Sequence, residues 1–142
     1  MAQAFNKFQD FVEQLCSGVH NLKAAGDLCK IMLTNTAPTA GMAALSEITE
    51  IGAGFGYTAG GEDVQNDISE TAGTATMLGT DVVWTAAGGT IGPFRYVVLY
   101  NDTPTTPVVD PLIGWWDYGS NVTLQDTETF TWNELTEIFT LT

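Results

Sequence analysis

The first twenty residues of the chain place apolar side chains at the spacing of an α-helix. The apolar positions are Phe5, Phe8, Phe11, Val12, Leu15, Cys16 and Val19. This spacing puts them on one stripe, with polar residues on the opposite face. We therefore predict a helix over about residues 3–18, which Gly18 ends.

The apolar stripe of this predicted helix has two possible partners. It can pack on the sheet of its own domain, or it can pack between subunits, since a terminal helix can do either. In the second case Phe5, Phe8 and Phe11 are candidate interface residues.

The rest of the chain consists of short apolar or alternating runs separated by turn residues. Valine, isoleucine, threonine and aromatic residues dominate these runs, which is typical of strands. The predicted strands cover residues 28–34, 74–78, 81–85, 94–101, 112–117, 122–124, 128–132 and 137–141. Turns about every eight to twelve residues favour an antiparallel sandwich or barrel. We predict a mainly β fold, an antiparallel β-sandwich or barrel-like domain of about residues 27–142 with an N-terminal α-helix, in a single domain of residues 1–142.

The segments between the strands are rich in glycine, proline and acidic residues. We expect one helical turn at 43–48, a glycine-rich loop at 51–61 anchored by Phe55 and Tyr57, and a proline-containing loop at 101–111. The acidic stretch 62–73 is expected on the surface, leading into an edge strand. The residues 118–120 are expected to form a turn between two strands.

Charge is distributed unevenly along the chain. The formal net charge is −13, and all of it comes from residues 31–142, where Arg95 is the one basic residue. This balance argues against binding to nucleic acid or anionic lipid, which needs clustered lysine and arginine. The acidic residues can serve solubility, or they can dock on a basic patch of a protein partner. Arg95 lies in a predicted strand, and we expect it to pair with an acid inside the chain or across an interface.

The sequence offers little evidence for a metal site, a cofactor or a membrane segment. Cys16 and Cys29 are expected to be buried free thiols, although a disulfide between them stays open, and no CxxC motif is present. Glu62, Asp63, Asp67 and Glu70 lack the ligand order of an EF-hand. No run approaches the ~20 apolar residues of a membrane span, and no signal peptide is recognised. We expect no cofactor and no bound metal.

Catalytic motifs are equally weak. His20 is the single histidine, and no GxSxG motif accompanies it, so we expect a capping or surface role for it. The glycine-rich loop reads GxGxG rather than GxGxxG, and no lysine lies beyond Lys30 to bind a phosphate. We therefore expect that the protein is not an enzyme.

The adjacent residues Trp115 and Trp116 are the clearest indication of oligomerisation. Neighbouring side chains on a strand point to opposite faces, so we expect one tryptophan in the core and the other at an interface. The four tryptophans could alternatively line a sugar-binding platform.

Several segments together resemble small structural proteins of tailed bacteriophages, including capsid decoration (cement) proteins and tail or fibre components. The segments are residues 33–38, 56–61, 81–86, 92–101, 112–114, 117–120 and 122–124. The resemblance implies a virion protein on the capsid surface, made in the cytoplasm of the bacterial host. It also implies binding to a major capsid protein and assembly as a homo-oligomer, with a trimer favoured. The alternative is a tail or fibre component that binds a receptor or carbohydrate, and a glycan-degrading enzyme is a third, more remote possibility.

Overall fold

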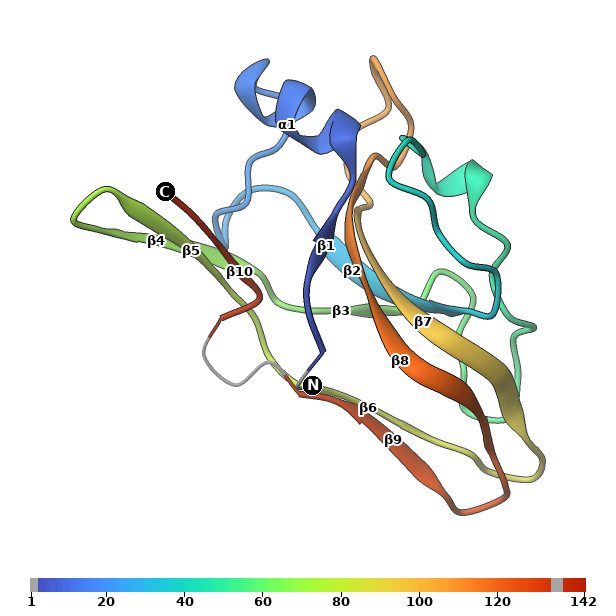
Figure 1. Cartoon of the computed structure of the whole chain (residues 1–142). Coiled ribbons are helices and arrows are strands. Elements are labelled where there is room, and N and C mark those ends of the chain that lie inside the picture. The colour runs from blue at the N-terminus through green and yellow to red at the C-terminus, as the bar shows by residue number, and fades with distance from the viewer. Residues whose placement is uncertain (1–2, 134–136) are drawn as a thin grey trace.

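The computed structural model describes residues 3–133 and 137–142, and it is mainly β with antiparallel sheets and one short helix. The predicted fold class is confirmed. The strands form three sheets, and a hairpin of one of the smaller sheets projects from the body of the molecule (Figure 1).

The largest sheet has five strands in the order β1-β8-β7-β2-β3. Its strands are β1 (Asn6–Lys7), β8 (Leu112–Leu124), β7 (Ile91–Asn101), β2 (Cys29–Thr34) and β3 (Glu62–Asp63). The central strands β2, β7 and β8 are rich in β-branched and aromatic residues, which suit a sheet covered on both faces. Pairing between β7 and β2 is regular along the whole of β2, from Cys29 opposite Asn101 to Thr34 opposite Tyr96.

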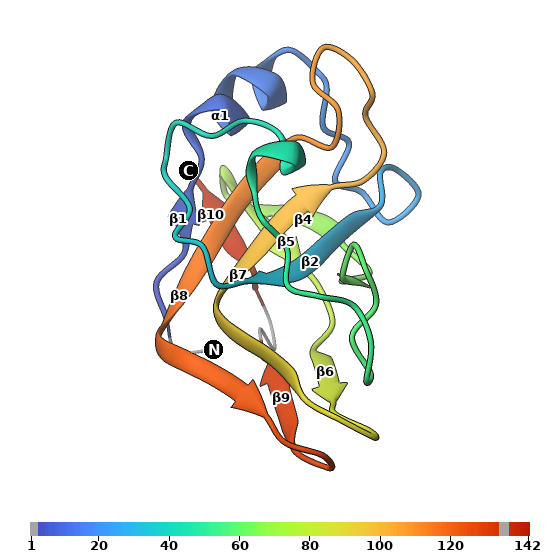
Figure 2. The same ribbon diagram turned by 90° about the vertical axis from the view of Figure 1, so that its right-hand side faces the viewer.

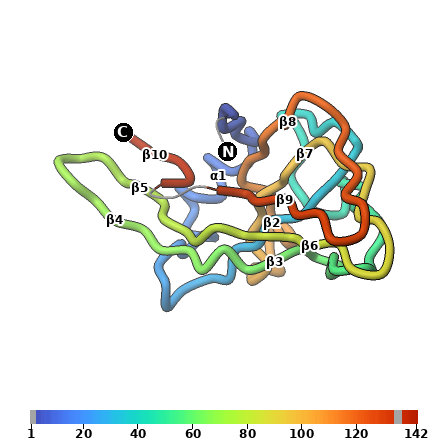
Figure 3. The backbone as a smooth tube through the Cα atoms, turned by 90° about the horizontal axis from the view of Figure 1, so that it is seen from below, coloured from blue at the N-terminus to red at the C-terminus, as the bar shows by residue number. Residues whose placement is uncertain are grey.

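The two smaller sheets have three and two strands. The first has the order β10-β5-β4, from β10 (Phe139–Leu141), β5 (Thr74–Leu78) and β4 (Asp67–Thr71). The second pairs β6 (Val82–Thr85) with β9 (Thr129–Trp132). Viewed from below, the β4–β5 hairpin reaches away from the five-stranded sheet, while β6 and β9 run across it (Figure 3). The sequence predicts that the acidic stretch leads into an edge strand, but the edge strand β4 lies within the stretch, and β5, which follows it, lies between β10 and β4.

The main core lies between the five-stranded sheet and the smaller sheets, which gives the fold its sandwich-like packing. Alternate residues of β2 and β7 enter it, among them Ile31, Leu33, Val97 and Leu99. The smaller sheets contribute Met77, Trp84, Phe130, Trp132 and Phe139. The apolar positions of the strands thus face a common interior, as the alternation in the sequence predicts.

The other face of the five-stranded sheet is covered by the segment that follows β2. This segment contains the 3₁₀ helix η1 (Leu45–Glu47) and passes in front of β2 and β7 (Figure 2). Its apolar residues Met42, Leu45 and Ile48 pack on a second cluster of Phe8, Met32, Val98, Tyr100 and Leu112. The Glu47 carboxylate accepts hydrogen bonds from the amides of Ala43 and Ala44 and so holds the predicted helical turn. Both faces of the central strands are therefore buried.

The N-terminal helix is shorter than predicted. It is α1 (Gln9–Cys16), and the residues before it form β1, in which Asn6 pairs with Trp115 and Lys7 with Gly114 of β8. The Phe5 ring lies over Gly114, where any Cβ atom would collide with it. The open edge of β8 offers hydrogen bonds to the chain before Phe8, and this long-range pairing outweighs the helical periodicity.

The predicted turn at 118–120 is wrong, because β8 continues through it. Phe94 pairs with Val122 and Tyr96 with Asp117, so β8 has three more residues than β7 between these two pairs. Gly119 takes up the irregularity with φ +100°, and its amide donates to Asp117 Oδ1. The turn residues thus form a bulge within a long bent strand.

Candidate interaction surfaces

The residues proposed as interface anchors lie mainly inside the chain. Phe8, Phe11 and Trp116 are 0 to 1% exposed, and Phe5 is partly buried against Trp116. Trp115 is half-buried and packs on the Phe8 ring at a centroid distance of 4.5 Å. The two tryptophans point to opposite faces of β8, as expected, but both faces are covered by the chain itself. In this fold Phe8, Phe11 and Trp116 present no free surface to a partner.

The basic side chains are largely engaged within the protein. Lys30 forms an ion pair with Asp102 at 2.8 Å, and the Lys23 ammonium donates to the Ile68 carbonyl at 2.9 Å. Arg95 donates through Nε and one terminal nitrogen to the two oxygens of Asp117, at 2.7 and 3.0 Å. The expected pairing of Arg95 with an acid is thus found inside the chain.

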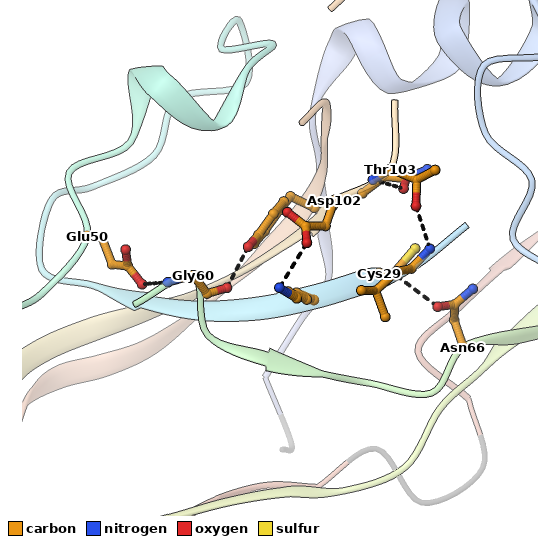
Figure 4. A network of polar contacts seen from close by, with 10 residues as sticks. Cys29, Glu50, Gly60, Asn66, Asp102 and Thr103 are labelled. Carbon is orange, nitrogen blue, oxygen red and sulfur yellow. Dashed lines mark hydrogen bonds and ion pairs between the residues drawn. The ribbon is translucent and has the colours of Figure 1, made fainter. Parts of the chain in front are cut away.

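A network of hydrogen bonds and ion pairs connects loops to β2 and its neighbouring strands (Figure 4). Asn66 accepts from the Cys29 amide, and Glu50 accepts from the Gly60 amide. The hydroxyl of Tyr57 donates to the same Glu50 oxygen at 2.7 Å and accepts from the Leu33 amide. Tyr57 therefore anchors the glycine-rich loop, as the sequence predicts. Burial raises the pKa of the Tyr57 hydroxyl, which stays protonated as a donor.

His20 lies inside the protein rather than in the expected surface or capping position. The side chain is 7% exposed and packs edge-on against the Phe11 ring. Its Nδ1 accepts from the Asn101 amide group at 3.0 Å, and the same amide nitrogen donates to Asp27 Oδ2 at 2.7 Å. Burial lowers the pKa of His20 to about 4, although the negative charges of Asp27 and Asp10 oppose that shift. The imidazole is thus neutral at pH 7 and is positioned by an amide.

The two cysteines are free and differ in exposure. Cys29 is buried, as expected, and burial raises the pKa of its thiol to about 12, which keeps it protonated and unreactive. Cys16 is exposed, against expectation, because the helix ends at this residue and turns Phe11 and Gln14 toward the core instead.

Two hollows lie at the end of the molecule that holds His20. One, of about 420 Å³, is lined by polar residues, among them Asp27, Asp63 and Asn66, and by apolar residues such as Ala24 and Leu28. Asp27 and Asn66 accept hydrogen bonds from amides of the chain itself, so this network fixes the loop before β2. The other, of about 300 Å³, is bounded by Leu15, Ile68 and Leu141, with His20 in its lining.

Three loops meet at the opposite end of the molecule, and we call this group the loop tip. It consists of residues 54–57, 86–89 and 125–128, of which the last two lie together at the lower end of β6 and β9 in Figure 1. The Ala87 amide donates to the Phe55 carbonyl at 2.9 Å, which joins the first two loops. The Gly88 amide donates to Asp126 Oδ1 and the Thr127 amide to the Ala86 carbonyl, both at 2.8 Å.

The loop tip exposes one aromatic ring and two carboxylates. Phe55 is 55% exposed, and its ring lies against Gly89, where a Cβ atom would come within 2.5 Å of it. Asp126 and Glu128 are exposed. Phe55 is thus not the buried loop anchor that the sequence suggested. The glycines around it gave no indication that the ring would face solvent, because that depends on how the three loops dock.

The described residues, 3–133 and 137–142, contain no group of three or more histidine, cysteine, aspartate or glutamate side chains able to hold a metal ion. Within those residues no helix is long and apolar enough to cross a membrane. No protein-family model, curated protein or solved structure matches the chain. The resemblance to phage structural proteins therefore stays a prediction from the sequence.

Proposed function

We propose that the protein is a non-enzymatic structural component of a phage virion, a decoration protein that binds capsid subunits and stabilises the head. In this role it assembles as a homo-oligomer, with a trimer favoured, and its partner is the major capsid protein. This role requires a stable fold with an exposed surface that can bind the capsid.

One observation carries the proposal: the surface is acidic, and most of its basic groups are already engaged within the chain. Lys23, Lys30 and Arg95 bind oxygen atoms of the chain itself, and they are three of its four basic residues. Carboxylates are exposed on many elements, including Glu13, Asp63, Glu70, Asp126 and Glu128. Such a surface attracts a basic protein surface and repels nucleic acid and anionic lipid.

The positions of the tryptophans also favour a structural role. Trp84, Trp116 and Trp132 are each about 1% exposed or less and fill the core. A sugar-binding platform would need tryptophan rings open to solvent, and Trp115 is also packed against Phe8. The alternative of a carbohydrate-binding tail or fibre component is therefore less favoured than decoration.

The experiment is light scattering coupled to size-exclusion chromatography, on the protein alone and mixed with purified heads of the phage that encodes it. We expect a stable oligomer that co-migrates with the heads and dissociates from them as sodium chloride is raised, because charge attraction is screened. A protein that stays apart from heads at low salt would refute decoration, and binding to host-cell glycans would then support the tail or fibre alternative.

A further inference from the structure

The loop tip contains two residues with strained backbone conformations. Phe55 has φ +55° and Thr127 has φ +76°, both in the left-handed region that L-residues with side chains adopt at a cost. Threonine is β-branched, so its conformation there is especially unfavourable. Strained residues persist where the surrounding structure imposes them, and such positions are concentrated at functional sites.

The strain at Phe55 holds an apolar ring where it gains little from burial. Glycine or asparagine would adopt the same backbone more easily. Phenylalanine instead keeps more than half of its surface in water, at 55% exposed. Gly89 lies against the ring, so close that a Cβ atom there would come within 2.5 Å of it. The tip therefore presents a fixed aromatic face to solvent.

The charged residues of the three loops have one sign. Residues 51–58, 85–90 and 125–129 contain Asp126 and Glu128 and no lysine or arginine. Each carboxylate is held by a backbone amide of the tip, Asp126 by Gly88 and Glu128 by Gln125, both at 2.8 Å. Gly89 contacts the Phe55 ring and the adjacent Gly88 binds Asp126, so the ring and this carboxylate belong to one site. An exposed ring and fixed carboxylates in one group of loops complement a guanidinium or ammonium group, which interacts with both.

From these observations we infer that the loop tip is the docking site for an arginine- or lysine-bearing segment of the partner protein, with Phe55 as its anchor. The inference rests on the proposed function and names the part of the surface that makes the contact. A second copy of the chain is a poor occupant, since two tips would bring Asp126 and Glu128 of both copies together. The partner cation stacks on Phe55 and pairs with the carboxylates of the loop tip.

The test compares variants of the full-length protein in two binding assays, one with purified heads and one with a synthetic peptide of alternating arginine and glycine, followed by NMR. Phe55→Gly and Phe55→Asn remove the ring and suit the positive φ, so they are expected to fold at least as well as the wild type. Both should weaken head binding roughly tenfold or more, as expected for a central aromatic anchor. Val109→Ala is the matched control, because Val109 is 57% exposed in a different loop and should leave binding unchanged.

A second variant tests the contribution of the carboxylates to binding separately from that of the Phe55 ring. Asp126→Asn with Glu128→Gln keeps an oxygen acceptor for each amide and removes both charges. This variant should bind heads more weakly and with a smaller salt dependence. In the wild type, the arginine peptide should shift the amide resonances of Phe55, Gly88 and Gly89, whereas a glutamate–glycine peptide should not.

The outcomes distinguish the two proposals. Heads that bind the Phe55 variants as tightly as the wild type overturn the docking site and leave decoration standing. Peptide shifts at the tip that depend on Phe55, without any head binding, support the docking site and refute decoration. If the protein neither binds heads nor shows peptide shifts at the loop tip, both decoration and the docking site are refuted.

Discussion

Single residues in this protein are held by contacts with backbone from distant segments, and Gly61 is the sharpest case. It has φ +77°, and a Cβ atom at this position would collide with the Ile31 carbonyl of β2. Gly73 has a similar φ of +85°, but a Cβ atom there would meet nothing within 4 Å. The pair separates the cost of backbone conformation from the cost of steric collision.

We expect Gly61→Ala to destabilise the fold by at least about 3 kcal/mol, because it adds overpacking against rigid backbone to the conformational cost. Gly73→Ala should cost only about 1 kcal/mol. Urea unfolding followed by tryptophan fluorescence measures both. Equal losses in the two variants would mean that the approach of Gly61 to β2 is looser than the structure describes.

His20 makes the stability depend on pH. Its pKa falls from an ordinary value of 6.5 to about 4 on folding. Between pH 4 and pH 6.5 the unfolded chain therefore binds a proton at His20 more readily than the folded chain does. Stability is therefore fully present above pH 6.5 and decreases as the pH falls toward 4, by up to about 3 kcal/mol.

The matched variant is His20→Gln, which keeps an acceptor for the Asn101 amide and does not titrate. Unfolding free energies of the two proteins should converge as the pH is lowered from 7 to 4.5, with the wild type losing more. Parallel pH profiles would show that burial of His20 does not govern this window.

At the scale of elements, α1 and β1 are parts of the core and not a free arm. Phe8, which lies between β1 and α1, is 0% exposed and contacts Trp115, whereas Val12 on α1 is 42% exposed. Phe8→Ala should destabilise the protein by about 3–5 kcal/mol through the cavity that it leaves. Val12→Ala should cost less than about 0.5 kcal/mol.

Thermal unfolding and light scattering on both variants check this assignment. Phe8→Ala is expected to lower the melting temperature without changing the mass of the folded protein. A Phe8→Ala variant that is folded and stable but no longer forms the oligomer would instead show that Phe8 is an interface residue.

At the scale of the whole molecule, a net charge of −13 opposes the compact state. The ion pairs Lys30–Asp102 and Arg95–Asp117 stabilise the folded state, but each is partly exposed to water, where ion pairs contribute little. Repulsion among the many carboxylates should therefore dominate the response to salt.

We expect the melting temperature to rise by several degrees between roughly 10 mM and 300 mM sodium chloride, as the Debye length falls below about 10 Å. Differential scanning calorimetry in a chloride series measures it, and potassium chloride should give the same curve. A melting temperature that falls with salt would show that the ion pairs outweigh the repulsion.

Local patterns in the sequence determined most of the strands and the class of the fold. Alternation and β-branched residues identified β2, β5, β6 and β9 within a residue or two, because the two faces of a strand are set by neighbouring residues. The acidic balance and the pairing of Arg95 with an acid also followed from the sequence, since one cation among many acids in a strand has acids within reach; the structure decided that this acid is Asp117 of the same chain.

Only the tertiary structure decided which surfaces the chain covers. The start of α1, the bulge in β8, the burial of His20 and the exposure of Cys16 all depend on pairing or packing between residues far apart in sequence. The same holds for the loop tip, where Phe55 is placed by contacts with residues 86–89. A local pattern records the propensity of a segment, whereas burial and exposure are properties of the segments that meet it.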